Sequence, residues 1–63
     1  MKRFAVNLKR ARLEAKLSQV EASRRAKVQQ GAWSEFENDK QTPTLGTAER
    51  LAKAVGKTLR DLV

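Results

Sequence analysis

Residues 17–38 of the chain, LSQVEASRRAKVQQGAWSEFEN, decide its fold, because they predict two short helices joined by a tight connection. Ser18 follows an apolar residue and precedes Glu21 by three positions, the spacing of a capping box in which each side chain accepts a backbone N–H. A helix is therefore predicted over residues 19–26. Its expected buried residues are Ala22, Ala26 and either Val20 or Ser23. A helix this short is unstable alone in water, so packing must stabilise it.

The second helix of the pair is predicted over residues 29–37, because Trp33 and Phe36 stand three positions apart and share one helical face. Its opposite face carries small and amide side chains, which are poor choices for a helix surface that meets only water. Gly31 alone costs about 1 kcal/mol of helix stability relative to alanine. Two explanations stay open for Gly31: a partner that approaches the backbone closely, or a chance replacement or tight contact with the preceding helix.

The chain before this stretch predicts one amphipathic helix over residues 4–16. Its apolar stripe consists of Phe4, Leu8, Ala11 and Ala15, at spacings of four and three. A basic amphipathic helix can also lie on a membrane surface. Because this stripe is narrow, packing against the protein's own core is the stronger interpretation.

The chain after the stretch predicts two further helices. Thr44, directly after Pro43, is typical of a helix N-cap, and Gly56 is typical of the residue that ends a helix. The expected apolar face between them is Leu45, Ala48, Leu51, Ala52 and Val55. Thr58, three positions before Asp61, caps a last turn. No strand pattern or repeat occurs, so the expected fold class is all-α, a compact bundle of five short helices in one domain that spans the chain.

Composition excludes several classes of function. The 63 residues include no cysteine and no histidine, so no disulfide, thiolate metal site or imidazole base can form. We therefore expect no metal, no cofactor and no enzyme activity. No apolar run approaches the roughly 20 residues of a membrane span, and the basic start lacks the apolar block of a signal peptide. A soluble, cytoplasmic protein without a membrane partner is expected.

The charge of the chain points to a polyanionic partner. Fourteen Lys and Arg against seven Asp and Glu give a formal net charge of +7. On so small a surface this charge attracts polyanions, and nucleic acid is the leading candidate. A solvated basic surface without such a partner is the alternative that charge alone leaves open.

The order of several motifs resembles that of the lambdoid-phage repressor and Cro-like helix-turn-helix family, often called XRE-type. The matching residues are Leu8, Arg12, Leu17-Ser18-Gln19, Val28, Trp33, Phe36, Glu37-Asn38, Pro43-Thr44-Leu45 and Leu51-Ala52-Lys53-Ala54-Val55-Gly56. They cover nearly the whole chain at the family's spacing. The chain also departs from the family. Ala22 and Ser23 stand where the family usually has Leu and then Ala, Trp33 replaces a smaller aliphatic residue, and Lys27 and Asp39 stand where the family has glycines. Lys27 would then adopt a positive φ, at a cost of order 1 kcal/mol, unless the turn is rebuilt.

The resemblance implies that the third helix lies in the major groove of double-stranded DNA and that the second helix meets the phosphate backbone with its N-terminus. The implied base-reading residues are Gln29, Gln30, Gly31, Ser34 and Glu35. The implied phosphate contacts are Ser18, Gln19, Lys27, Asn38, Lys40, Gln41 and Thr42. By resemblance, Gln19 also braces Gln30 with a hydrogen bond, and Arg12 pairs with Glu37 as a structural ion pair.

These implications predict a sequence-specific transcriptional regulator, a repressor that binds a palindromic operator as a homodimer. The expected dimer surface is Leu59, Leu62 and Val63, and inward packing of this last turn is the alternative. An antitoxin or accessory regulator of the same fold, with a toxin as protein partner, stays open. A protein-interaction or RNA-associated helical module is a further alternative.

Overall fold

The structure, a computed structural model, describes residues 2–63 and contains five helices within them. They are α1 (Lys2–Glu14), α2 (Gln19–Ala26), α3 (Gln30–Glu37), α4 (Leu45–Ala54) and α5 (Leu59–Leu62). No strand occurs in this part of the chain, so the predicted all-α bundle is confirmed. None of these helices is both long enough and apolar enough to cross a membrane.

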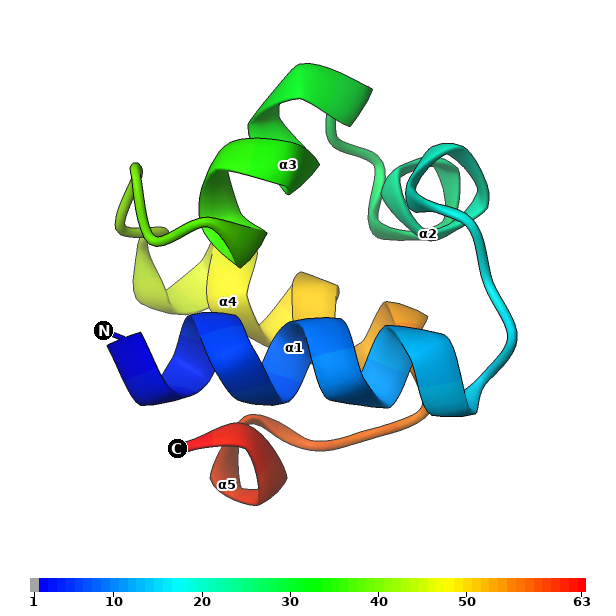
Figure 1. The fold of residues 1–63 in the computed structure, drawn as a ribbon. Helices are drawn as coiled ribbons and strands as arrows, with labels where there is room; N and C mark the ends of the chain where they lie inside the picture. The colour runs from blue at the N-terminus through cyan, green and yellow to red at the C-terminus, as the bar shows by residue number, and fades with distance from the viewer. Residues whose placement is uncertain (1) are drawn as a thin grey trace.

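The five helices form two groups around one core. α1 lies across the front with α4 behind it and α5 below it, whereas α2 and α3 lie together above α1 (Figure 1). α2 packs against both α3 and α4, and α1 packs against α3 and α5. This arrangement places α2 and α3 at one side of the molecule, supported from below by the longest helix.

Short polar side chains start the helices at the predicted positions. The Ser18 Oγ accepts the N–H of Glu21 at 3.0 Å, and the Thr44 Oγ1 accepts the N–H of Thr47 at 3.3 Å. The prediction of a complete capping box at Ser18 is wrong, because the Glu21 carboxylate lies 3.8 Å from the cationic groups of Arg24 and Arg25 instead. A box with both hydrogen bonds forms only at the start of α5 among the described helices, where Thr58 and Asp61 exchange them.

Four helices end in the same way, with a residue in the left-handed region. These residues are Lys16, Lys27, Asp39 and Gly56, with φ values of 59°, 60°, 58° and 76°. At the end of α2, the N–H of Lys27 donates to the carbonyl of Arg24 at 3.1 Å and that of Val28 to the carbonyl of Ser23 at 3.0 Å, which is a Schellman motif. The positive φ expected for Lys27 is therefore present, and the turn is not rebuilt.

The core is filled mainly by α1, α3 and α4. Trp33, Leu8 and Leu51 are its largest fully buried side chains. Ser23 rather than Val20 is the further buried residue of α2, and its hydroxyl donates to the carbonyl of Val20 at 2.8 Å. The chain thus buries this small polar group with a hydrogen-bond partner, as burial requires.

Two predicted core positions and one predicted surface position are wrong. Ala15 is exposed because α1 ends one residue before it, and Leu45 is 70% exposed because it begins α4 before that helix reaches the core. Leu62, predicted on the dimer surface, is 2% exposed and belongs to the core, and its carbonyl accepts a hydrogen bond from the Asn7 Nδ2 at 2.9 Å. Leu59 is partly buried against the same core, and Val63 is 60% exposed.

Candidate nucleic-acid interface

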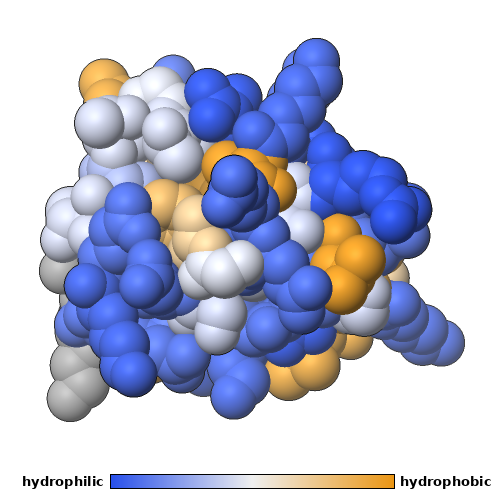
Figure 2. Space-filling model, turned by 90° about the horizontal axis from the view of Figure 1, so that it is seen from above, coloured by the Kyte–Doolittle hydropathy of each residue, from blue (hydrophilic) through white to orange (hydrophobic). Residues whose placement is uncertain are grey.

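The face of α3 opposite Trp33 and Phe36 is open to solvent. The residues predicted to read bases are exposed on it, except for Ser34, which is half-buried: Gln29, Gln30, Gly31, Ser34 and Glu35. Gln29 is the N-cap residue of α3 but makes no capping hydrogen bond with its side chain. Figure 2, which looks onto the molecule from the side of α2 and α3, shows a mainly hydrophilic surface with separate hydrophobic residues. This face therefore offers polar side chains on a regular helix.

Gly31 has no packing role inside the protein. A Cβ atom built at this position meets no heavy atom within 4 Å. The alternative of a tight contact between Gly31 and the preceding helix is therefore excluded. A partner outside the chain and a chance replacement are the two explanations that remain.

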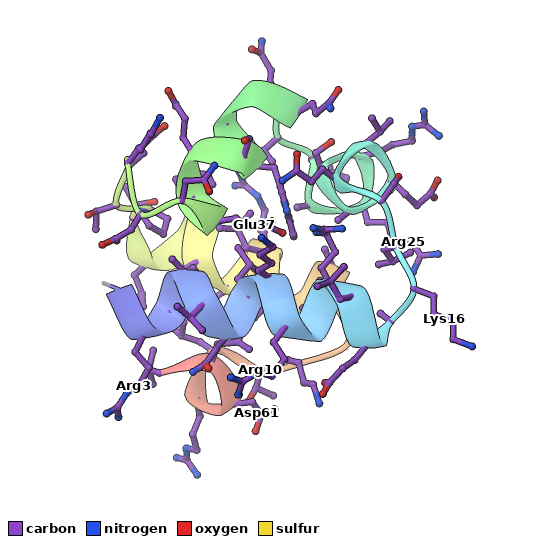
Figure 3. The ribbon with its side chains drawn as sticks, viewed as in Figure 1. Arg3, Arg10, Lys16, Arg25, Glu37 and Asp61 are labelled. Carbon is purple, nitrogen blue, oxygen red and sulfur yellow. The ribbon has the colours of Figure 1, made fainter. Side chains whose placement is uncertain are left out.

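The carboxylate of Glu37 is the point at which α1, α2 and α3 are joined. Its Oε2 accepts hydrogen bonds from the Arg12 Nε and the Trp33 Nε1, each at 2.6 Å. Its Oε1 accepts from the Gln19 Nε2 at 3.1 Å and from a second guanidinium nitrogen of Arg12 at 3.3 Å. Glu37 and Arg12 are only 6% and 7% exposed, and Figure 3 shows Glu37 between α1 and α3. The ion pair implied by the family resemblance is thus part of a larger network.

The network sets the protonation state of Glu37. Burial by itself raises the pKa of this carboxyl group, because it disfavours the charged form. The hydrogen bonds from Arg12, Trp33 and Gln19, with the charge of Arg12, outweigh burial and hold the pKa below its ordinary value of 4.5. Glu37 is therefore ionised at neutral pH, and the buried charge is fully compensated.

Gln19 has a different partner from the one expected. Its Nε2 donates to Glu37, and no hydrogen bond joins it to Gln30 in the described part of the chain. A carboxylate is the stronger acceptor for an amide N–H, because the hydrogen bond is charge-assisted. The predicted brace between Gln19 and Gln30 is therefore absent, and the bond to Glu37 instead fixes the start of α2 beside the end of α3.

The predicted phosphate contacts lie on three separate segments. Gln19, at the start of α2, reaches Glu37 with its side chain, whereas the segment that follows α3 projects on the side away from α2 (Figure 1). Ser18 and Gln19 stand at the start of α2, and Asn38, Lys40, Gln41 and Thr42 follow α3; all of them but Gln19 are exposed. The Asn38 Nδ2 also donates to the Ser34 Oγ at 3.3 Å. Lys27 lies at the opposite end of α2.

The sequence analysis missed two side-chain hydrogen bonds that join parts of the fold. The indole N–H of Trp33 donates to Glu37, and the spacing of four positions between the two residues on one helix is the signal that could have revealed this bond. The Arg50 Nε donates to the carbonyl of Ala26 at 3.2 Å and so caps the end of α2. Arg50 and Ala26 are 24 positions apart, so no local sequence pattern predicts their contact.

Comparison with known families agrees with this geometry. A family model described as a helix-turn-helix domain matches residues 3–63. No curated protein and no solved structure matches the chain. Two short helices joined by a tight turn, the second with an exposed polar face, are the arrangement by which such domains bind DNA. Through this match over residues 3–63, the chain belongs to the helix-turn-helix domain family.

Proposed function

We propose that this protein is a sequence-specific regulator of transcription that inserts α3 into the major groove of double-stranded DNA. The observation that carries the proposal is the exposed polar face of α3, on a helix that Glu37 ties to α1 and α2. A helix held in this way presents its side chains in a fixed orientation, which base reading requires. The open space beside Gly31 leaves room for close approach of a groove wall or a thymine methyl group.

Each exposed residue of α3 has a chemical match in the groove. The amide of Gln30 can bind the N6 and N7 atoms of adenine together, and the carboxylate of Glu35 can accept from the N4 of cytosine. Ser34 offers a hydroxyl that suits several bases. Lys40 and its neighbours after α3, together with the exposed start of α2, would position the domain on phosphates.

The regulator would act as a repressor and bind a palindromic operator as a dimer, because one module of this size makes few contacts with DNA. Leu62 is buried in the core, so the dimer would use the exposed Val63 beside the partly buried Leu59. Sedimentation over a range of concentrations, with and without operator DNA, measures this association. A monomer on a single half-site at all concentrations would contradict the dimer.

Selection of bound sequences from random duplex DNA tests the proposed function. We expect a palindromic motif to be enriched, and the logarithm of its affinity to fall linearly with the logarithm of the salt concentration. Gln30→Ala should reduce the preference for one base at one operator position by about tenfold to a hundredfold. Lys40→Ala should instead weaken binding to all sequences about equally. Recovery of no motif would contradict sequence-specific binding.

A further inference from the structure

An open pocket of about 370 Å³ lies between the end of α2 and the second half of α4. Its lining residues are Arg25, Ala26, Lys27, Arg50, Lys53 and Ala54. Four of these six residues are cationic and none is acidic. A pocket of this volume is large enough for a small ligand or a few side chains of a partner.

The positive charge of this pocket is barely compensated within the protein. Arg25 has one weak ion pair, at 3.8 Å from the half-buried Glu21. Arg50 donates to the neutral carbonyl of Ala26, which holds its guanidinium at the pocket wall without cancelling its charge. No carboxylate within residues 2–63 forms an ion pair with Lys27 or Lys53. The pocket therefore attracts an anionic group from outside the chain.

Lys27 occupies its position in the pocket at a cost. Its φ of 60° lies in the left-handed region, where a residue with a side chain is less stable than glycine by roughly 1–2 kcal/mol. Glycine would form the same end of α2 without this cost. Lys16 and Asp39 adopt the same conformation, with φ values of 59° and 58°, so this cost follows from the way the helices end. The case for a ligand therefore rests on the charge and the lining of the pocket.

The pocket lies away from the face of α3 that would read DNA. Gln19 and Arg25 are six positions apart on α2, which at about 3.6 residues per turn places their side chains roughly 120° apart around the helix. Gln19 is on the flank that meets α3, since it binds Glu37. Figure 3 shows Arg25 on the outer side of α2, apart from Glu37. The pocket is thus a second surface on α2.

We infer that this pocket binds an acidic segment of a partner protein, through glutamate or aspartate side chains. Arg25 and Arg50 carry planar guanidinium groups that match a carboxylate with two parallel hydrogen bonds. Ala26 and Ala54 supply apolar surface for the methylene groups of an acidic side chain. This combination of cations and apolar surface suits a peptide better than a bare phosphate backbone. Such a segment could stay bound while α3 contacts DNA.

Nuclear magnetic resonance titration of the whole chain with a hexaglutamate peptide tests the inference, with hexaglutamine as the neutral control. We expect hexaglutamate to shift the backbone amide signals of residues 25–27 and 50–54, and hexaglutamine to leave them unchanged. The amide signals of residues 30–35 should shift when duplex DNA is added and stay unchanged when the peptide is added. Peptide shifts spread over all basic segments, or confined to residues 30–35, would overturn the inference.

Matched lysine variants separate this pocket from the general positive charge. Lys53→Gln should weaken the affinity for hexaglutamate about threefold, and the double variant Lys27→Gly, Lys53→Gln should weaken it about tenfold. Lys9→Gln removes the same charge from the exposed surface of α1 and should leave the affinity unchanged. An equal loss in Lys9→Gln would overturn the inference, and so would displacement of the peptide by duplex DNA. Because the peptide titration needs no operator, its result is independent of the proposed DNA binding.

Discussion

At the scale of single residues, Glu37 connects three helices. It is a buried carboxylate with hydrogen bonds from Arg12, Trp33 and Gln19, and the three donors come from three different helices. A buried ion pair adds little stability compared with apolar packing, but removal of one member leaves an uncompensated charge. The network therefore makes the orientation of α2 and α3 depend on a few side chains.

Arg12→Ala should destabilise the fold strongly, because it leaves the Glu37 carboxylate buried without its cation. We expect a loss of about 3 kcal/mol in the free energy of unfolding, measured by urea denaturation. Arg24→Ala is the matched control, since Arg24 is exposed and lies 3.8 Å from Glu21, and it should cost less than about 1 kcal/mol. Equal denaturation midpoints for the two variants would refute this role of Arg12.

The pH dependence of stability follows from the same carboxylate. The folded state holds the pKa of Glu37 below 4.5, so the unfolded chain binds the proton more readily. The resulting stabilisation is complete above the unfolded pKa and is lost as pH falls through the lower, folded pKa. We expect the melting temperature to drop over this acidic range. Glu37→Gln should start from a lower melting temperature and show a smaller drop, and an unchanged slope would contradict the assignment.

At the scale of the helices, the caps at both ends explain where each element begins and stops. Ser18, Thr44 and Thr58 accept a backbone N–H three positions on, as their residue types predict. The C-terminal ends are less regular in sequence, because Gly56 is the only glycine among the four left-handed residues that end α1 to α4. The other three helices end with the same geometry at a higher conformational cost.

Lys27→Gly should stabilise the protein, because glycine adopts the φ of 60° without the Cβ clash. We expect a gain of about 1 kcal/mol in the free energy of unfolding, measured by thermal and urea denaturation. Lys27→Ala is the matched control: it removes the same charge but keeps the clash, so it should bring no comparable gain. A gain of equal size in both variants would show that charge, and not conformation, is responsible.

Gly31→Ala separates stability from function on α3. A Cβ at this exposed position meets no heavy atom of the rest of the protein within 4 Å, so the variant should gain up to about 1 kcal/mol of stability. If α3 lies close to the groove wall, the same methyl group should weaken binding to the selected operator. A melting curve and a binding titration measure the two effects. Higher stability with unchanged affinity would contradict close approach at Gly31.

At the scale of the whole molecule, the helices separate the two surfaces to which we assign different partners. The exposed face of α3, with the start of α2 and the segment 38–42, forms one polar surface. The pocket between α2 and α4 forms another, on the far flank of α2, and is the more basic of the two. The net charge of +7 favours anionic partners, and it makes their binding sensitive to salt.

The sequence by itself determined where the helices lie, because caps and apolar spacings act within a few residues of the chain. It also indicated the polar face of α3 and the positive φ at Lys27, the latter through a family resemblance. Two of its failures, Ala15 and Leu45, lie at the ends of apolar stripes, where burial depends on the neighbouring helix.

Only the tertiary structure decided which side chains meet across helices. Gln19 binds Glu37 across 18 positions, and Arg50 reaches Ala26 across 24. It also decided that Leu62 packs into the core and that four cations surround one pocket. Such contacts depend on the angles and distances at which helices pack, which follow from the shape of the whole core and not from any local stretch of sequence.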